Sequence, residues 1–311
     1  MSRLRLIPFH ELGPAAQLVA IADRVAQSPP GLVLVTGQGG SGKFTMALAL
    51  AQRLARPGQP VLLLHPAQSA LSEFGPLPPV WRRVVVAADL SVVQPAEAQP
   101  WRQALAAADI AGDALVVVDV IDELNVQSVL AAAEGRWLLA PVDTPLLGLD
   151  VAYALGAFGV SDDEFLDRVR VVWSQQLVEL VCELCAAPAA LGPEEARFLF
   201  PRGLPGTNLR RAVGCAACAG QGRNTTGHRG RDAVCDVLLI DDTTRAACAQ
   251  ALREGTAPAL PPDAHVTIQQ LAHSLAGSAR SSGLRSTVRR YVSTLMRPLP
   301  ARLCASCWMV T

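Results

Sequence analysis

Residues 32–45 read Leu-Val-Leu-Val-Thr-Gly-Gln-Gly-Gly-Ser-Gly-Lys-Phe-Thr. The apolar, β-branched run over residues 32–36 is typical of a buried strand, and the alanine- and leucine-rich residues 45–54 are typical of a helix. Glycines between a strand and a helix let backbone N–H groups approach an anion, and the helix N-terminus presents partial positive charge to it. The glycine loop, residues 37–43, is therefore predicted to bind phosphate groups.

Lys43 is the only lysine of the chain, although the chain has 27 basic residues. A compact ammonium on a flexible stem fits a phosphate-binding loop, whereas a wide, planar guanidinium does not. Lys43 is therefore expected to bridge the β- and γ-phosphates of ATP, as in a Walker A motif. A glycine-rich turn without a ligand is the alternative, but it leaves the lone lysine unexplained. The residues predicted to bind nucleotide are Gly37, Gln38, Gly39, Gly40, Ser41, Gly42, Lys43, Phe44 and Thr45.

The position after the lysine departs from this motif. A serine or threonine normally stands there and ligates Mg²⁺ through its hydroxyl, but Phe44 has no oxygen to offer. Thr45 could still supply a hydroxyl near the α-phosphate. Nucleotide binding is thus predicted, while the role of Mg²⁺ and metal-assisted hydrolysis are in doubt.

Asp119 ends another apolar run and is the candidate Walker B acid. In that catalytic role it would hold the hydration shell of Mg²⁺ or orient water. A polar residue at the end of a strand is the alternative interpretation, and Asp122 and Glu123 are close by in the sequence.

The rest of the chain favours an α/β fold with three parts. Strands alternating with helices predict a mostly parallel, doubly wound sheet. Further strands are expected over residues 61–64, 83–87, 114–119 and 137–140, with a helix over 127–134. Cysteines appear near residue 180, a strand is expected over 233–240, and residues 243–296 have a helical pattern. We expect a core over residues 1–180, a small subdomain over 181–235, and a helical C-terminal segment and tail over 236–311.

Composition excludes several classes of protein. The 311 residues carry 27 basic and 27 acidic side chains, which argues against nucleic-acid binding by bulk attraction. Half of the residues are hydrophobic, which argues against intrinsic disorder. No apolar run is long enough for a membrane span or a signal peptide, so the expectation is a soluble, cytoplasmic protein.

Four cysteines form two pairs with the spacing of a metal site. The cysteine quartet consists of Cys182, Cys185, Cys215 and Cys218, in two Cys-x-x-Cys pairs. Two such pairs can direct four thiolates at one tetrahedral Zn²⁺, and four thiolates close its coordination sphere, so this zinc would be structural. Four reduced cysteines without metal are the alternative. Cys235 and Cys248 are expected in the core, and the pair Cys304 and Cys307 is interpreted as a tail feature.

Together these segments resemble the ATPase family that drives type II secretion and type IV pilus assembly. Residues 30–43 resemble its Walker A segment, and residues 177–185 resemble the entry into its zinc subdomain. Residues 214–218, with Thr226-Gly-His-Arg-Gly-Arg231 and Cys235-Asp-Val-Leu238, resemble the exit from that subdomain. The resemblance runs from about residue 12 to about residue 293, so the chain looks like the family's C-terminal motor domain standing nearly alone. It implies a RecA-like P-loop NTPase core with nucleotide at the subunit edges of a hexamer.

Several catalytic signatures of that family are altered in this sequence. Its Asp box falls on Leu64-His65-Pro66, and its Walker B signature falls around residues 118–122, where Asp119 replaces the glutamate. Its histidine box falls on residues 134–144, which contain no histidine, and Gln176 stands in place of a motif arginine. Since phosphoryl transfer depends on metal and positioned charge, these losses predict impaired or absent hydrolysis.

Three functions therefore stay open. The favoured hypothesis is a degenerate family member that binds ATP and acts as an assembly partner or regulator. The alternatives are an active ATPase that powers secretion or pilus assembly, and a zinc-stabilised binding module without nucleotide. The resemblance also implies platform proteins of the inner membrane as partners, a peripheral location there, and homo-hexamers or mixed rings with a full-length paralogue.

Overall fold

A computed structural model of the chain describes residues 6–12, 16–66, 69, 74–86, 98–109, 115–188, 193, 210–211, 213–219, 227–261 and 263–267. Its helices are η1 (Phe9–Leu12), α1 (Ala16–Gln27), α2 (Lys43–Leu54), α3 (Ala98–Asp109), α4 (Val126–Ala132), η4 (Gly148–Asp150), α5 (Val151–Gly156), α6 (Asp162–Arg168), α8 (Ala216–Ala219) and α9 (Arg245–Glu254). Its strands are β1 (Leu32–Gly37), β2 (Val61–His65), β3 (Trp81–Val85), β4 (Leu115–Val118), β5 (Leu138–Asp143), β6 (Val169–Val181), β7 (Ala187–Pro188), β8 (Arg210–Arg211), β9 (His228–Leu239) and β10 (His265–Val266).

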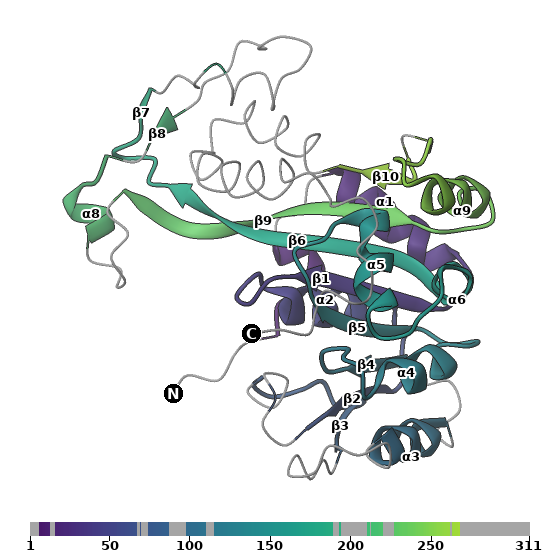
Figure 1. Ribbon diagram of the computed structural model, residues 1–311. Coiled ribbons are helices and arrows are strands. Elements are labelled where there is room, and N and C mark those ends of the chain that lie inside the picture. The colour runs from purple at the N-terminus through teal and green to yellow at the C-terminus, as the bar shows by residue number, and fades with distance from the viewer. Residues whose placement is uncertain are drawn as a thin grey trace, which may run out of the picture. The chain divides into compact units, whose positions relative to one another are not determined.

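The main sheet has eight strands in the order β10-β9-β6-β1-β5-β4-β2-β3 (Figure 1). Strand β1 pairs in parallel with both β5 and β6, and β2 pairs in parallel with both β3 and β4. The short strand β10 runs antiparallel to β9. The predicted α/β class with a mostly parallel sheet is confirmed, and the order places the strand before the glycine loop between two neighbours.

Both faces of the central strands β1, β2, β4 and β5 are buried, which explains their nearly continuous apolar runs. Successive strand residues point to opposite faces. Leu32 and Leu34 join a core cluster with apolar residues of α3, α4, α6 and α9. Val33 and Val35 are equally buried, and α2 packs against β1, β4 and β5. The glycine loop is thus anchored at both ends in a packed α/β core.

The chain divides into two compact units. The first unit consists of residues 1–176 and 235–266, and the second of residues 177–234 and 267–311. Two of the divisions fall within β6 and β9, and the third directly follows β10. The three-part division expected at residues 180 and 235 is a different partition and stays a prediction.

Two elements differ from the expectations. Strand β6 extends over 13 residues where no strand was expected, and it continues past its apolar start through Ser174, Gln175 and Gln176. The helical pattern after residue 243 gives only α9 in the described residues, because Gly255 ends the helix with a φ of +64° and prolines follow. Residues from 268 onward, including Cys304 and Cys307, lie outside the described part of the chain.

Among the described residues, the helices are all too short or too polar to span a lipid bilayer.

Candidate functional site

The glycine loop connects β1 to α2 and leaves almost no room at its first glycine. A Cβ atom on Gly37 would lie 2.4 Å from the carbonyl oxygen of Gln175 and 2.5 Å from Ser41 Oγ. Gly40 and Gly42 have φ angles of +79° and +81°, which side-chain-bearing residues rarely adopt. The loop therefore needs these glycines for its shape, as a tight phosphate-binding turn does.

Gln175 holds the loop from the neighbouring strand β6. Its Nε2 donates a hydrogen bond of 2.7 Å to the carbonyl oxygen of Ser41. Gln175 and Ser41 are both buried, and the hydroxyl of Ser41 has no hydrogen-bond partner in the described structure. A buried hydroxyl without a partner costs free energy, so this loop retains an unused polar group. Sequence analysis named Gln176 as the altered motif position but did not name Gln175. The segment Gln175-Gln176-Leu177 was the signal that could have indicated it.

Lys43 begins α2 and contacts a carboxylate that sequence analysis also missed. Its Nζ forms an ion pair with Asp143 at the end of β5 and lies 3.5 Å from the carbonyl oxygen of Gln38. The lysine side chain is only 6% exposed, whereas that of Asp143 is 56% exposed. Asp143 lies within the segment compared with the family's histidine box, and that was the available signal.

The next two residues of α2 are half-buried. The ring centroid of Phe44 lies 5.9 Å from Lys43 Nζ, so an aromatic ring occupies the surroundings of the ammonium. Thr45 follows in the first turn of the same helix.

Asp119 lies directly after β4, and its backbone N–H donates to the carbonyl oxygen of Leu64 at 3.0 Å. Its Oδ1 accepts a hydrogen bond from the backbone N–H of Val120 at 2.8 Å. The carboxylate of Asp122 instead accepts from the N–H groups of Leu124 and Asn125, so it shapes the turn before α4. The role of Asp119 as a Walker B acid stays a prediction.

His65 ends β2, beside β4 in the sheet, and is 1% exposed. Its Nδ1 lies 2.7 Å from the carbonyl oxygen of Pro66. Its Nε2 is buried and, in the described structure, has no hydrogen-bond partner. Of the two ring nitrogens of His65, only Nδ1 therefore has a hydrogen-bond partner in the described structure.

The cysteine quartet comes together as its spacing predicts. All four Sγ atoms lie within 4.8 Å of one another. The distances are 3.9 Å for Cys182–Cys215, 3.8 Å for Cys185–Cys218 and 3.6 Å for Cys215–Cys218. Four sulfurs each about 2.3 Å from one tetrahedral ion would lie about 3.8 Å apart. Disulfide sulfurs lie only about 2.05 Å apart. The donor set therefore fits Zn²⁺.

Each Cys-x-x-Cys pair closes a tight turn, with the N–H of Cys185 bonded to the carbonyl of Cys182 and that of Cys218 to the carbonyl of Cys215. A hydrogen bond from the backbone N–H of Cys215 to Cys218 Sγ is the main cause that lowers the pKa of Cys218 to about 7. Burial acts to raise this pKa, but a second hydrogen bond, from the N–H of Gly227, also lowers it. Burial raises the pKa of the Cys185 thiol to about 11. Metal binding would require both as thiolates.

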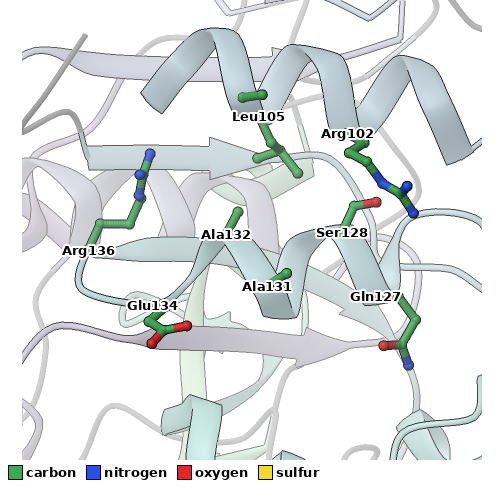
Figure 2. Close-up of a pocket in the computed structure, with 9 residues that line it drawn as sticks. Arg102, Leu105, Gln127, Ser128, Ala131, Ala132, Glu134 and Arg136 are labelled. Carbon is green, nitrogen blue, oxygen red and sulfur yellow. The ribbon is translucent and has the colours of Figure 1, made fainter. Parts of the chain in front are cut away.

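A cavity of about 610 Å³ lies between α3 and α4, with Arg102, Leu105, Ser128 and Ala131 among its lining residues (Figure 2). Glu134 and Arg136 line it just before β5 begins, at the opposite end of that strand from Asp143. The Glu134 carboxylate also pairs with Arg168 at 2.9 Å. This cavity is therefore separate from the glycine loop.

Residues 112–282, more than half of the chain, match a family model described as "Type II/IV secretion system protein". The chain belongs to this type II/IV secretion system family. The matched residues include Asp119, Asp143 and the cysteine quartet, whereas the glycine loop lies before them.

Two relatives with similar sequences support the assignment of this chain to the family. This chain is 28% identical over 267 residues to the type II secretion system protein E of Dickeya dadantii, and the aligned region covers 85% of this chain and 49% of that protein. It is 27% identical over 245 residues to the type IV pilus assembly ATPase PilB of Thermus thermophilus, and here the aligned region covers 76% of this chain and 25% of that protein. This chain thus spans about half or less of the length of each of these two relatives.

A solved structure supports the fold. The crystal structure of the pilus retraction motor PilT with bound ADP superposes with a TM-score of 0.52 at 15% identity, over 89% of this chain and 65% of PilT. The expected fold, that of the secretion and pilus ATPases, is confirmed for this type II/IV secretion family member.

Proposed function

We propose that this chain binds an adenine nucleotide at the glycine loop, hydrolyses it poorly or not at all, and serves as an assembly partner or regulator of a type II secretion or type IV pilus system. The observation that carries this proposal is the glycine loop itself, with buried Lys43 at the start of α2 and Phe44 in place of the hydroxyl-bearing residue. The backbone N–H groups and Lys43 would bind the phosphates, and Gln175 would hold the loop in shape.

Poor hydrolysis follows from the side chains around the loop. Phe44 offers no oxygen to Mg²⁺, and His65 stands where the family's Asp box has acids. Asp143 stands in the segment of the histidine box and carries a negative charge near Lys43. Since one positioned group can be worth two or more powers of ten in rate, several such changes together favour a nucleotide-binding role over turnover.

An active ATPase is the second candidate, and one observation favours it. Asp119 follows β4, and Asp143 is the last residue of the neighbouring parallel strand β5. The two carboxylates therefore lie at the same end of the sheet. Carboxylates suit Mg²⁺ and could replace the missing hydroxyl. In that case Asp119 would act as the Walker B acid.

The cysteine quartet is proposed to hold a structural Zn²⁺ within the second unit. The ion would cross-link two chain segments about 30 residues apart, which would stabilise the glycine-containing segment between them. Partners among inner-membrane platform proteins, a six-membered ring and mixing with a full-length paralogue are proposed from the family resemblance.

The proposal is tested by phosphate release from Mg·ATP with the purified, zinc-replete chain, its Lys43→Ala variant and an Arg56→Ala control. Arg56 is an exposed cation after α2, so its loss should leave the glycine loop intact. We expect turnover of the natural chain to be no higher than that of Lys43→Ala. Turnover that disappears only in Lys43→Ala would instead establish the active ATPase.

Titration with a fluorescent ATP analogue addresses binding. We expect saturable binding by the natural chain and by Arg56→Ala, and at least about tenfold weaker binding by Lys43→Ala, because a charged hydrogen bond to phosphate is lost. No saturable binding by any of the three would favour a zinc-stabilised module without nucleotide.

A further inference from the structure

The ammonium of Lys43 is engaged by a carboxylate of the same unit. Lys43 Nζ is paired with Asp143 Oδ1 and has the Gln38 carbonyl oxygen 3.5 Å away. An ammonium has three N–H donors and no acceptor, so these contacts leave a single donor for a ligand. Because the lysine is buried and the aspartate is exposed, the pair presents a carboxylate beside the loop.

The sheet register fixes this carboxylate next to the glycine loop. Strand β5 pairs in parallel with β1, and Asp143 lies opposite Gly37, the first residue of the loop. β5 also lies between β1 and β4, which Asp119 follows. Asp143 therefore stands on the side of the loop that faces the candidate Walker B acid, where a terminal phosphate would be expected.

We propose that Asp143 makes the glycine loop selective for nucleoside diphosphates over triphosphates, an inference that rests on the proposed nucleotide site. In a phosphate-binding loop the lysine reaches the β- and γ-phosphates. A diphosphate needs only the donor that Lys43 has left, so the ion pair with Asp143 can persist. A γ-phosphate must displace Asp143 from Lys43 and then lies beside a second negative charge.

The surroundings of Lys43 offer little to offset this repulsion. Phe44 occupies the position whose hydroxyl would normally help to hold a divalent cation, and its ring centroid lies 5.9 Å from Lys43 Nζ. Two anions a few ångströms apart near a protein surface repel each other strongly. The chain would thus remain in a diphosphate-bound state, which suits a regulator that does not cycle through hydrolysis.

The test is isothermal titration of ADP and of ATP into the zinc-replete chain, with and without Mg²⁺, for the natural sequence and for Asp143→Asn. Asparagine keeps the size of the side chain and removes its charge. Asp163→Asn, on the exposed first turn of α6, is the matched control. We expect the natural chain and the control to bind ADP at least about tenfold more tightly than ATP. In Asp143→Asn, ATP affinity should rise about tenfold or more, while ADP affinity changes by less than about threefold.

Two outcomes would overturn this inference while leaving the nucleotide site intact. One is that the natural chain binds ATP as tightly as ADP. This measurement does not depend on whether any variant folds. The other is that Asp143→Asn keeps the natural ADP-to-ATP ratio or weakens Mg·ATP binding, as loss of a metal ligand would. No heat of binding for either nucleotide, with any variant, would instead overturn the proposed nucleotide site itself.

Discussion

Gly37 and Gly39 lie two positions apart in the glycine loop but have opposite surroundings. A Cβ on Gly37 would meet the Gln175 carbonyl oxygen and Ser41 at distances below 3 Å, and the φ of this residue is +153°. A Cβ on Gly39 would have no atom within 4 Å. The first glycine is therefore required by the packing of the protein, whereas the second borders open space where a ligand could lie.

We predict that Gly37→Ala lowers the free energy of unfolding of the first unit by about 1–3 kcal/mol, because the methyl group overpacks a site that cannot yield. Gly39→Ala should change it by less than about 0.5 kcal/mol. Urea unfolding followed by circular dichroism, without nucleotide, measures both. Equal midpoints for the two variants would contradict the described shape of the loop.

At the scale of single elements, the start of α9 depends on Asp241. Its Oδ1 accepts hydrogen bonds from the backbone N–H groups of Thr243 and Thr244, at 2.9 and 3.1 Å. Its Oδ2 lies 2.7 Å from an Arg24 nitrogen, and another nitrogen of Arg24 contacts Asp263 at 2.6 Å. One carboxylate thus joins the turn that precedes α9 to α1.

Asp241→Ala should destabilise the first unit by about 1 kcal/mol at pH 7, because the hydrogen bonds to the turn before α9 and the ion pair with Arg24 are lost. Burial acts to raise the pKa of Asp241, but hydrogen bonds from Thr243 and Arg24 outweigh it, and the folded pKa is lowered. The stabilisation is therefore complete above the unfolded pKa of about 3.9 and is lost as the pH falls through the lower folded value.

Thermal denaturation from pH 3 to pH 8 measures this effect. The difference between the natural chain and Asp241→Ala should be constant above about pH 5 and shrink below about pH 4. Asp242→Ala, at the exposed next position, is the control and should unfold like the natural chain. A difference that grows on acidification would have the wrong sign for this explanation.

The elements themselves were predictable to different degrees. Strands β1, β2 and β4 were predicted close to their observed bounds because both of their faces are buried, which leaves an apolar run in the sequence. Strand β6 was missed because it includes polar residues such as Ser174 and Gln175. Both are nevertheless buried, since Ser174 Oγ accepts from Thr36 Oγ1 at 2.8 Å and Gln175 bonds to the glycine loop. Their partners come from other strands, so no local pattern indicates burial.

At the scale of the whole molecule, the two candidate sites belong to different units. The glycine loop, Asp119 and Asp143 lie in the first unit, and the cysteine quartet lies in the second. Each site should therefore stabilise the unit that contains it, because a ligand that binds only the folded state stabilises that state.

We predict about one zinc per chain in the natural protein and in Cys248→Ser, and much less in Cys218→Ser. Cys248 is the matched control because it is a buried thiol of the first unit, where burial raises its pKa to about 11. Elemental analysis measures the zinc, and limited proteolysis with and without a chelator measures protection of the second unit. Equal zinc in both variants would exclude the cysteine quartet as the metal site.

The sequence by itself determined the α/β class, the strand–glycine loop–helix unit with Lys43, and the grouping of four cysteines, because each of these depends on local spacing. Only the tertiary structure decided which groups surround the lysine and the loop. Asp143 is 100 residues from Lys43, and Gln175 is 134 residues from Ser41, yet both pairs are in contact. These contacts exist because β5 and β6 lie on either side of β1, and strand order is set by the packing of the whole sheet and by no pattern within one segment.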